Sequence, residues 1–176
     1  MFDLVNGIPA HPLFVHAPLV LIPLTLLLGL VYVVAPPLRP RIDWALVVLA
    51  IASPLSALTA TQSGERLAER LGSSDAIDRH QQYGETVQNL AAALLAVVLL
   101  LVLTDRLRAA RKRRQRALAE GDEPGAPYRN TGGGVWTVVS VLLSVVLLGV
   151  GGVTGTYLYL TGDSGAKMVW SATAER

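Results

Sequence analysis

The sequence predicts an all-α integral membrane protein, a bundle of four transmembrane helices with both chain termini on the outer face (N-out, C-out). Two features of the composition indicate this class: 52% of the 176 residues are hydrophobic and only 16% are charged. Soluble globular domains carry about 25% charged residues. The third observation is that four apolar runs reach bilayer-spanning length, which requires about 20 residues.

The apolar runs give the expected transmembrane helices, which cover about residues 12–35, 44–61, 86–104 and 135–160. The third run is expected to be the membrane part of a longer helix, about 75–118, with a helix cap at Ser73 or Ser74. Glycine and proline in 121–134 predict a flexible connector on the cytoplasmic side. The whole chain, 1–176, is therefore expected to form a single membrane domain.

Basic residues predict the orientation, because loops rich in Lys and Arg stay on the cytoplasmic side. Arg39 and Arg41 lie between the first two runs, and the stretch RLRAARKRRQR, 106–116, follows the third. The N-terminus, the segment 62–85 and the C-terminal tail are then outside. A basic stretch can also bind nucleic acid through its phosphates. This one has no interleaved aromatic residues and lies where an inserting helix needs cytoplasmic charge, so we interpret it as an orientation signal and expect no nucleic-acid partner. The partner expected throughout is the lipid bilayer. Thirteen of the fifteen basic residues are arginine, a bias typical of GC-rich bacterial coding, so the expected location is a bacterial inner membrane.

The first run opens unusually, with two histidines and three prolines in HPLFVHAPLVLIP, from His11 to Pro23. Pro12 suits the first turn of a helix. Pro18 and Pro23 each remove a backbone donor, so a kink near the outer end is expected. His80 precedes the third run, and all three histidines are therefore expected at one face of the membrane.

Histidines on separate helices can supply the axial ligands of a haem that lies between them. His16 and His80 are the expected metal ligands, because His11 and His16 would point about 140° apart on a continuous helix. Gly84, one turn below His80, leaves space for a porphyrin edge. His11 or Asp163 could support a ligating imidazole through a hydrogen bond. These residues predict a b-type haem and electron transfer with a redox partner or membrane complex, with Phe14 and Tyr83 as the nearest rings.

Two alternatives stay open at this stage. Zinc accepts three imidazoles with water in the fourth position, so the histidines could form a zinc site. They could also be interfacial polar residues of a non-catalytic scaffold or accessory subunit. Such a bundle would be held by stripes of small residues. The stripes are Ser53, Ala57, Ala60 and Gly64 in the second run, and Ser140, Ser144, Gly151 and Gly155 in the fourth.

Other chemistries are disfavoured by the residues that the runs contain. Transporters usually place carboxylates or basic residues deep within their spans, and these four runs hold no Asp, Glu, Lys or Arg. The chain has no cysteine, which excludes disulfides and thiolate ligands of its own. The stretch GDSG, 162–165, has the letters of a serine-protease motif. Its place after a membrane helix instead favours a C-terminal turn, with Gly162 or Gly165 at positive φ.

The opening GIPAHP, 7–12, followed by Val15, His16 and Pro18, resembles the G-x-P-x-H-P-x-x-V-H-x-P opening of a bacterial family of predicted four-helix membrane proteins of unknown function. His80 and the ending GTYLYLTGDSGAKMVW, 155–170, are similar to the same family. The resemblance spans essentially the whole chain and implies a four-helix membrane fold. Some relatives are joined to a Rieske domain, which implies a redox setting for those members.

Overall fold

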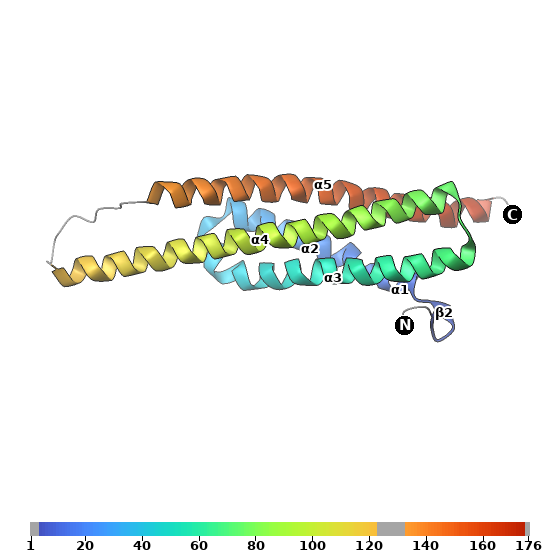
Figure 1. Cartoon of the computed structure of the whole chain (residues 1–176), viewed down its shortest axis with the longest axis horizontal. Helices are drawn as coiled ribbons and strands as arrows, with labels where there is room; N and C mark the ends of the chain where they lie inside the picture. The colour runs from blue at the N-terminus through green and yellow to red at the C-terminus, as the bar shows by residue number, and fades with distance from the viewer. Residues whose placement is uncertain (1–3, 123–132, 175–176) are drawn as a thin grey trace.

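The fold is a bundle of long helices, seen in a computed structural model that describes residues 4–122 and 133–174 (Figure 1). In chain order the elements are β1 (Leu4–Val5), β2 (Ile8–Pro9), α1 (His11–Phe14), α2 (His16–Val34), η1 (Pro36–Leu38), α3 (Arg39–Leu71), α4 (Asp75–Asp122) and α5 (Gly133–Ala174). Four helical stretches, with α1 and α2 counted as one, are long and apolar enough to cross a membrane. The predicted all-α, four-helix membrane bundle is confirmed.

The helices extend beyond the apolar runs that predicted them. The second begins at Arg39 and continues to Leu71, and the fourth continues to Ala174. Hydrophobicity marks only the part of a helix suited to lipid, whereas backbone hydrogen bonding continues through polar flanks. Most of the expected connector, 121–134, lies outside the described residues, and its described flanks are helical.

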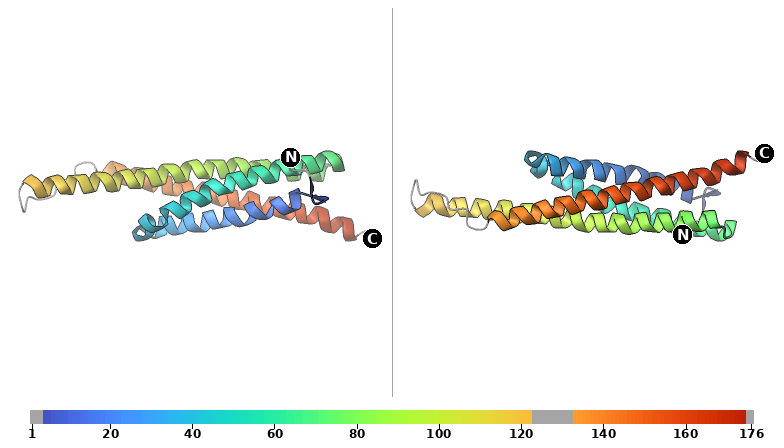
Figure 2. Two further views of the ribbon diagram at one scale, coloured as in Figure 1. Left: turned by 90° about the horizontal axis from the view of Figure 1, so that it is seen from below. Right: turned by 90° about the horizontal axis from the view of Figure 1, so that it is seen from above.

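The two ends of the bundle differ in chemistry. The β1–β2 hairpin, α1, the α3–α4 turn and the last turns of α5 lie at one end, here called the histidine end (Figures 1 and 2). The α2–α3 junction and the second half of α4 lie toward the other, here called the basic end. With 48 residues α4 is about 72 Å long at 1.5 Å per residue. That length exceeds the roughly 45 Å of a bilayer with its headgroups. At the basic end α4 continues past the α2–α3 junction (Figure 1).

Turn residues explain how the elements are joined. Asn6 and Gly7 both have positive φ, 52° and 81°, as a two-residue type I′ hairpin turn requires. Gly72, with φ 83°, ends α3. The hydroxyl of Ser74 accepts a hydrogen bond from the N–H of Ile77 at 3.3 Å. The predicted cap at the start of the third transmembrane helix is therefore confirmed at Ser74.

The first transmembrane helix is interrupted just before Pro18, as the sequence predicts, whereas Pro23 lies inside the continuous helix α2. Pro18 has no N–H group, so the carbonyl of Phe14 lacks its usual helical donor. Helix α1 ends at Phe14, and α2 begins after Val15. His11 consequently belongs to a short helix of its own, which packs on α3.

Small residues let the helices approach closely. Ser53 and Ala57 of α3 are buried, and the Ser53 hydroxyl lies 2.8 Å from that of Thr25 on α2. A Cβ at Gly151 would lie 3.1 Å from the Leu26 side chain, and one at Gly155 would lie 3.6 Å from it. Both predicted small-residue stripes thus serve helix packing. The larger core cluster contains Tyr32, Leu46, Ala50, Leu94, Val98, Leu101, Val102 and Leu147.

Candidate functional site

The histidine end brings two imidazole rings together from different helices. His11, on α1, and His80, on α4, have ring centroids 6.2 Å apart and ring planes at 86°. Both side chains are half-buried. We call His11 and His80 the histidine pair.

The His11 ring is fixed by the backbone of α3. Its Nδ1 atom lies 2.9 Å from the carbonyl oxygen of Ala60. A carbonyl can only accept, so Nδ1 carries the proton and Nε2 is left with the lone pair in the neutral ring. The ring also needs a glycine beside it, because a Cβ at Gly64 would lie 3.0 Å from its Cε1 atom.

The His80 ring is fixed in the same manner by α5. Its Nδ1 atom lies 2.8 Å from the Ser164 hydroxyl oxygen. That hydroxyl donates its own proton to the carbonyl of Thr161 at 3.0 Å, and it therefore accepts from Nδ1. A Cβ at Gly165 would lie 3.1 Å from Cε1 of His80. Gly64 and Gly165 are thus matched positions, each giving room to one ring.

This arrangement leaves Nε2 of each ring available to a ligand. A hydrogen bond from the other ring nitrogen is the usual way in which proteins orient a metal-binding histidine. Two imidazoles that bind one metal ion from opposite sides, each through a nitrogen about 2 Å from the metal, have ring centres roughly 6 Å apart. The observed centroid separation fits that requirement.

The expected pairing of His16 with His80 is wrong in this structure, since His80 meets His11 and the His16 side chain is exposed. Pro18 begins the buried face of α2. His16 lies two residues earlier, about 200° around the helix, and so turns away from the bundle. His11 lies on α1 and faces α3, so the placement of α1 and α2 in the bundle decides which of the two histidines faces inward.

The support expected from Asp163 comes instead from its neighbour Ser164. Asp163 pairs with Lys167 at 2.7 Å, one turn further along α5. The turn expected at GDSG is also wrong, because α5 continues through it. Among the described residues, the glycines with positive φ are Gly7 and Gly72. The continuous helix is what carries Ser164 to His80.

Three further residues were expected beside a bound cofactor: Gly84, Tyr83 and Phe14. A Cβ at Gly84 would meet no atom within 4 Å. The Tyr83 ring lies edge to face with that of Tyr157 on α5, with centroids 6.1 Å apart. Phe14 is half-buried.

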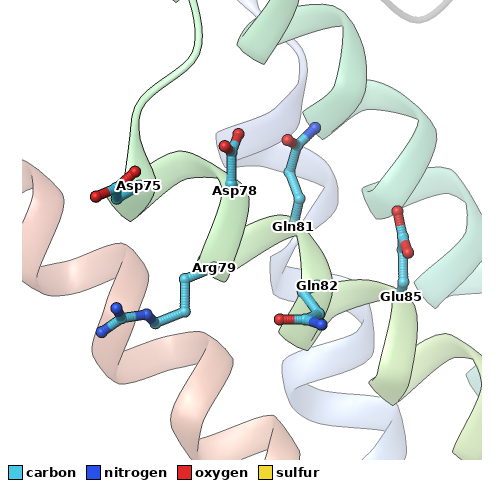
Figure 3. A pocket seen from close by; sticks show the side chains of 6 residues that line it. All are labelled: Asp75, Asp78, Arg79, Gln81, Gln82 and Glu85. Carbon is cyan, nitrogen blue, oxygen red and sulfur yellow. The ribbon is translucent and has the colours of Figure 1, made fainter.

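A three-ligand metal site does not form in the part of the chain that the structure describes, where no group of three or more histidine, cysteine or acidic side chains is close enough to hold an ion. A hollow of about 520 Å³ lies beside the start of α4 (Figure 3). All the side chains that line it come from the first turns of this one helix, and it encloses no site. They are Asp75, Asp78, Arg79, Gln81, Gln82 and Glu85.

A second polar cluster, at the basic end, was not predicted from the sequence. Asp105 of α4 accepts hydrogen bonds from the Tyr32 hydroxyl at 3.1 Å, the Arg39 guanidinium at 3.0 Å and the Ser140 hydroxyl at 2.8 Å. Each of the four long helices contributes one residue. We call Tyr32, Arg39, Asp105 and Ser140 the clasp. The sequence did contain one indication of this cluster, since Asp105 is an acidic residue directly after the third apolar run.

The clasp also completes the end of α2. Arg39 donates from Nε to the carbonyl of Tyr32 at 2.8 Å and from Nη2 to that of Val33 at 3.4 Å. Both carbonyls belong to the last turn of α2, which lacks helical donors. Next to the clasp, Arg106 pairs with Asp43 at 2.8 Å.

Comparison with known proteins places this architecture in a family. A family model described as "Predicted membrane protein (DUF2231)" matches residues 7–175. The chain belongs to this family. Membership agrees with the four membrane-spanning helices and covers the histidine pair and the clasp alike. No curated protein and no solved structure was found to match the chain.

Proposed function

We propose that this membrane protein binds a b-type haem through the histidine pair and transfers electrons at the histidine end of the bundle. The observation that carries the proposal is the pair itself. Two half-buried imidazoles from different helices have Nε2 free and ring centroids 6.2 Å apart.

The residues around the pair support a role in holding a ligand. The Ala60 carbonyl and the Ser164 hydroxyl each accept a hydrogen bond from one imidazole, which fixes the tautomer and the ring orientation. Gly84 lies one turn after His80 on α4, and a Cβ there would meet no atom within 4 Å. His11 and His80 would hold the haem, which would supply one-electron chemistry, and ligation by two protein side chains would favour electron transfer with a redox partner over binding of a small molecule.

The test is the absorption spectrum of the full-length protein, produced with a haem supply and purified in detergent. We expect a Soret band and the reduced-minus-oxidised spectrum of a six-coordinate b-type haem. His11→Ala and His80→Ala are each expected to abolish or strongly change that spectrum. His16→Ala is the matched control, because His16 is exposed and should leave the spectrum unchanged.

Two outcomes would reject the haem proposal. One is a protein that stays colourless when haemin is added. The other is loss of the spectrum in His16→Ala together with its retention in His11→Ala. Metal analysis of the same sample separates the zinc alternative, since bound zinc without iron would assign the pair to zinc.

The second candidate function is a scaffold or accessory subunit without a cofactor. It is favoured by one specific observation: each imidazole already ties two helices together, His11 joining α1 to α3 and His80 joining α4 to α5. On this account the purified protein is colourless. The two alanine variants then lower the free energy of unfolding, by about 1 kcal/mol for each hydrogen bond lost.

We infer further that the histidine end faces outward from a bacterial inner membrane. The support is the concentration of arginine at the opposite end, since positively charged loops remain in the cytoplasm. Ser74 and Arg114 are both exposed and lie at opposite ends of α4. In intact spheroplasts, Ser74→Cys should react with an impermeant thiol reagent and Arg114→Cys should not. Labelling of Arg114→Cys alone would reverse the orientation.

A further inference from the structure

The basic end carries an excess of positive charge that neither the histidine pair nor the clasp uses. Seven basic residues and no acidic residue lie between Arg106 and Ala117. Two carboxylates beside this stretch are already engaged, since Asp105 pairs with Arg39 and Asp43 pairs with Arg106. The remaining positive charge of this stretch is therefore expected to attract anions from its surroundings.

Two of these arginines lie in the second half of α4, one of them where that helix passes the start of α5. Arg108 is half-buried one turn after Asp105, on the continuation of the buried face of α4. Arg111 follows one turn later, and the centre of its guanidinium lies 4.6 Å from the centroid of the Trp136 ring on α5. A cation–π contact of this kind orients the guanidinium plane. The planar donors of arginine match phosphate oxygens in pairs.

The depth of this region corresponds to lipid headgroups. The apolar part of α4 ends just before Asp105. Trp44, which is 64% exposed at the start of α3, and Trp136, half-buried at the start of α5, flank the same region. Tryptophan concentrates at the boundary between hydrocarbon and headgroups. Arg108 and Arg111 follow directly after that boundary.

We propose that Arg108, Arg111 and Trp136 form a binding site for the phosphodiester headgroup of an anionic phospholipid at the basic end. Charge complementarity and headgroup depth favour this occupant over a soluble anion. Each basic residue near an anionic surface contributes attraction on the order of 1 kcal/mol. The site adds a fixed guanidinium and an aromatic ring to that general attraction, and it does not depend on the function of the histidine pair.

The experiment compares two lipids with the same acyl chains. The full-length protein in neutral detergent receives dioleoyl phosphatidylglycerol or dioleoyl phosphatidylcholine, and its Tm is measured. We expect the anionic lipid to raise Tm by at least about 2 °C more than the zwitterionic lipid. The variant Arg108→Gln/Arg111→Gln should lose most of this difference. The matched control Arg113→Gln/Arg114→Gln removes the same charge further along α4 and should keep it.

Three outcomes would overturn the site. Equal losses in the two double variants would show diffuse attraction, and equal stabilisation by both lipids would show no selectivity for charge. The same rise in Tm with inorganic phosphate alone would show that the lipid is not required. If Arg108→Gln/Arg111→Gln does not fold, the single variant Arg111→Gln decides. It should lose about half of the difference, and an unchanged difference contradicts the proposal.

Discussion

The clasp makes a quantitative prediction about how the four helices are joined at the basic end. The side chains of Arg39 and Asp105 are only 18% and 14% exposed, and Asp105 accepts from three donors. Removal of one partner from a buried ion pair costs about 3–5 kcal/mol, because the other charge remains buried without compensation. Since both groups keep some contact with solvent, we expect the lower value, about 3 kcal/mol, for Asp105→Leu.

A double-mutant cycle isolates the interaction between the two charges. Arg39→Met alone should also cost about 3 kcal/mol, because it leaves Asp105 charged and buried. If the residues did not interact, the double variant Arg39→Met/Asp105→Leu would cost the sum, about 6 kcal/mol. We expect no more than about 3 kcal/mol, since neither charge is then buried alone.

The assay is reversible unfolding of the purified protein in mixed micelles by SDS, followed by helical circular dichroism. Lys167→Met is the control, because both side chains of the Lys167–Asp163 pair keep more contact with solvent, 75% and 35% exposed, so its loss should lower stability far less than loss of either clasp charge. Additive losses in the double variant, or a stability of Asp105→Leu equal to that of the parent, would refute the reasoning.

The remaining predictions concern glycines and use the same unfolding assay. Gly84→Ala should raise the unfolding free energy by up to about 1 kcal/mol, because its Cβ meets nothing within 4 Å and alanine favours the helix. Gly165→Ala should gain less or lose stability, since its Cβ would lie 3.1 Å from Cε1 of His80; equal gains would contradict the contact. Gly151→Leu should lower stability because this glycine packs against α2, whereas the exposed Gly152→Leu should not. Equal effects of these two leucines would place both glycines in lipid.

Much of the fold was predictable because its signals are local. The length of the uncharged apolar runs predicted the four spans. Proline predicted a kink near the start of the first span, where α1 ends at Phe14, and Ser74 was one of two predicted helix caps. The helix ends were less predictable. The GDSG stretch has the composition of a turn, yet it is part of α5, which continues beyond its apolar run. Packing of α5 on α4 outweighs the local preference of these residues.

The candidate site was predictable only in part. The sequence indicated that histidines gather at one end of the bundle, and it named His80 and Gly84 correctly as neighbours on one helix. It favoured His16 as the partner of His80, whereas the structure brings His11 there. The contact of Ser164 with His80 spans 84 positions in sequence, and no periodicity within either helix encodes it.

The number of apolar spans and the distribution of charge along each could be predicted from the sequence, because they depend on neighbouring residues and on transfer into lipid. The tertiary structure alone decided which side chains meet. A membrane helix is apolar on the face toward lipid and on the face toward its neighbours, so its hydrophobic pattern does not fix its rotation. The placement of α1 and α2 in the bundle turns His11 inward and leaves His16 exposed. The same freedom of rotation and register let Arg39 and Asp105, 66 positions apart, close the clasp.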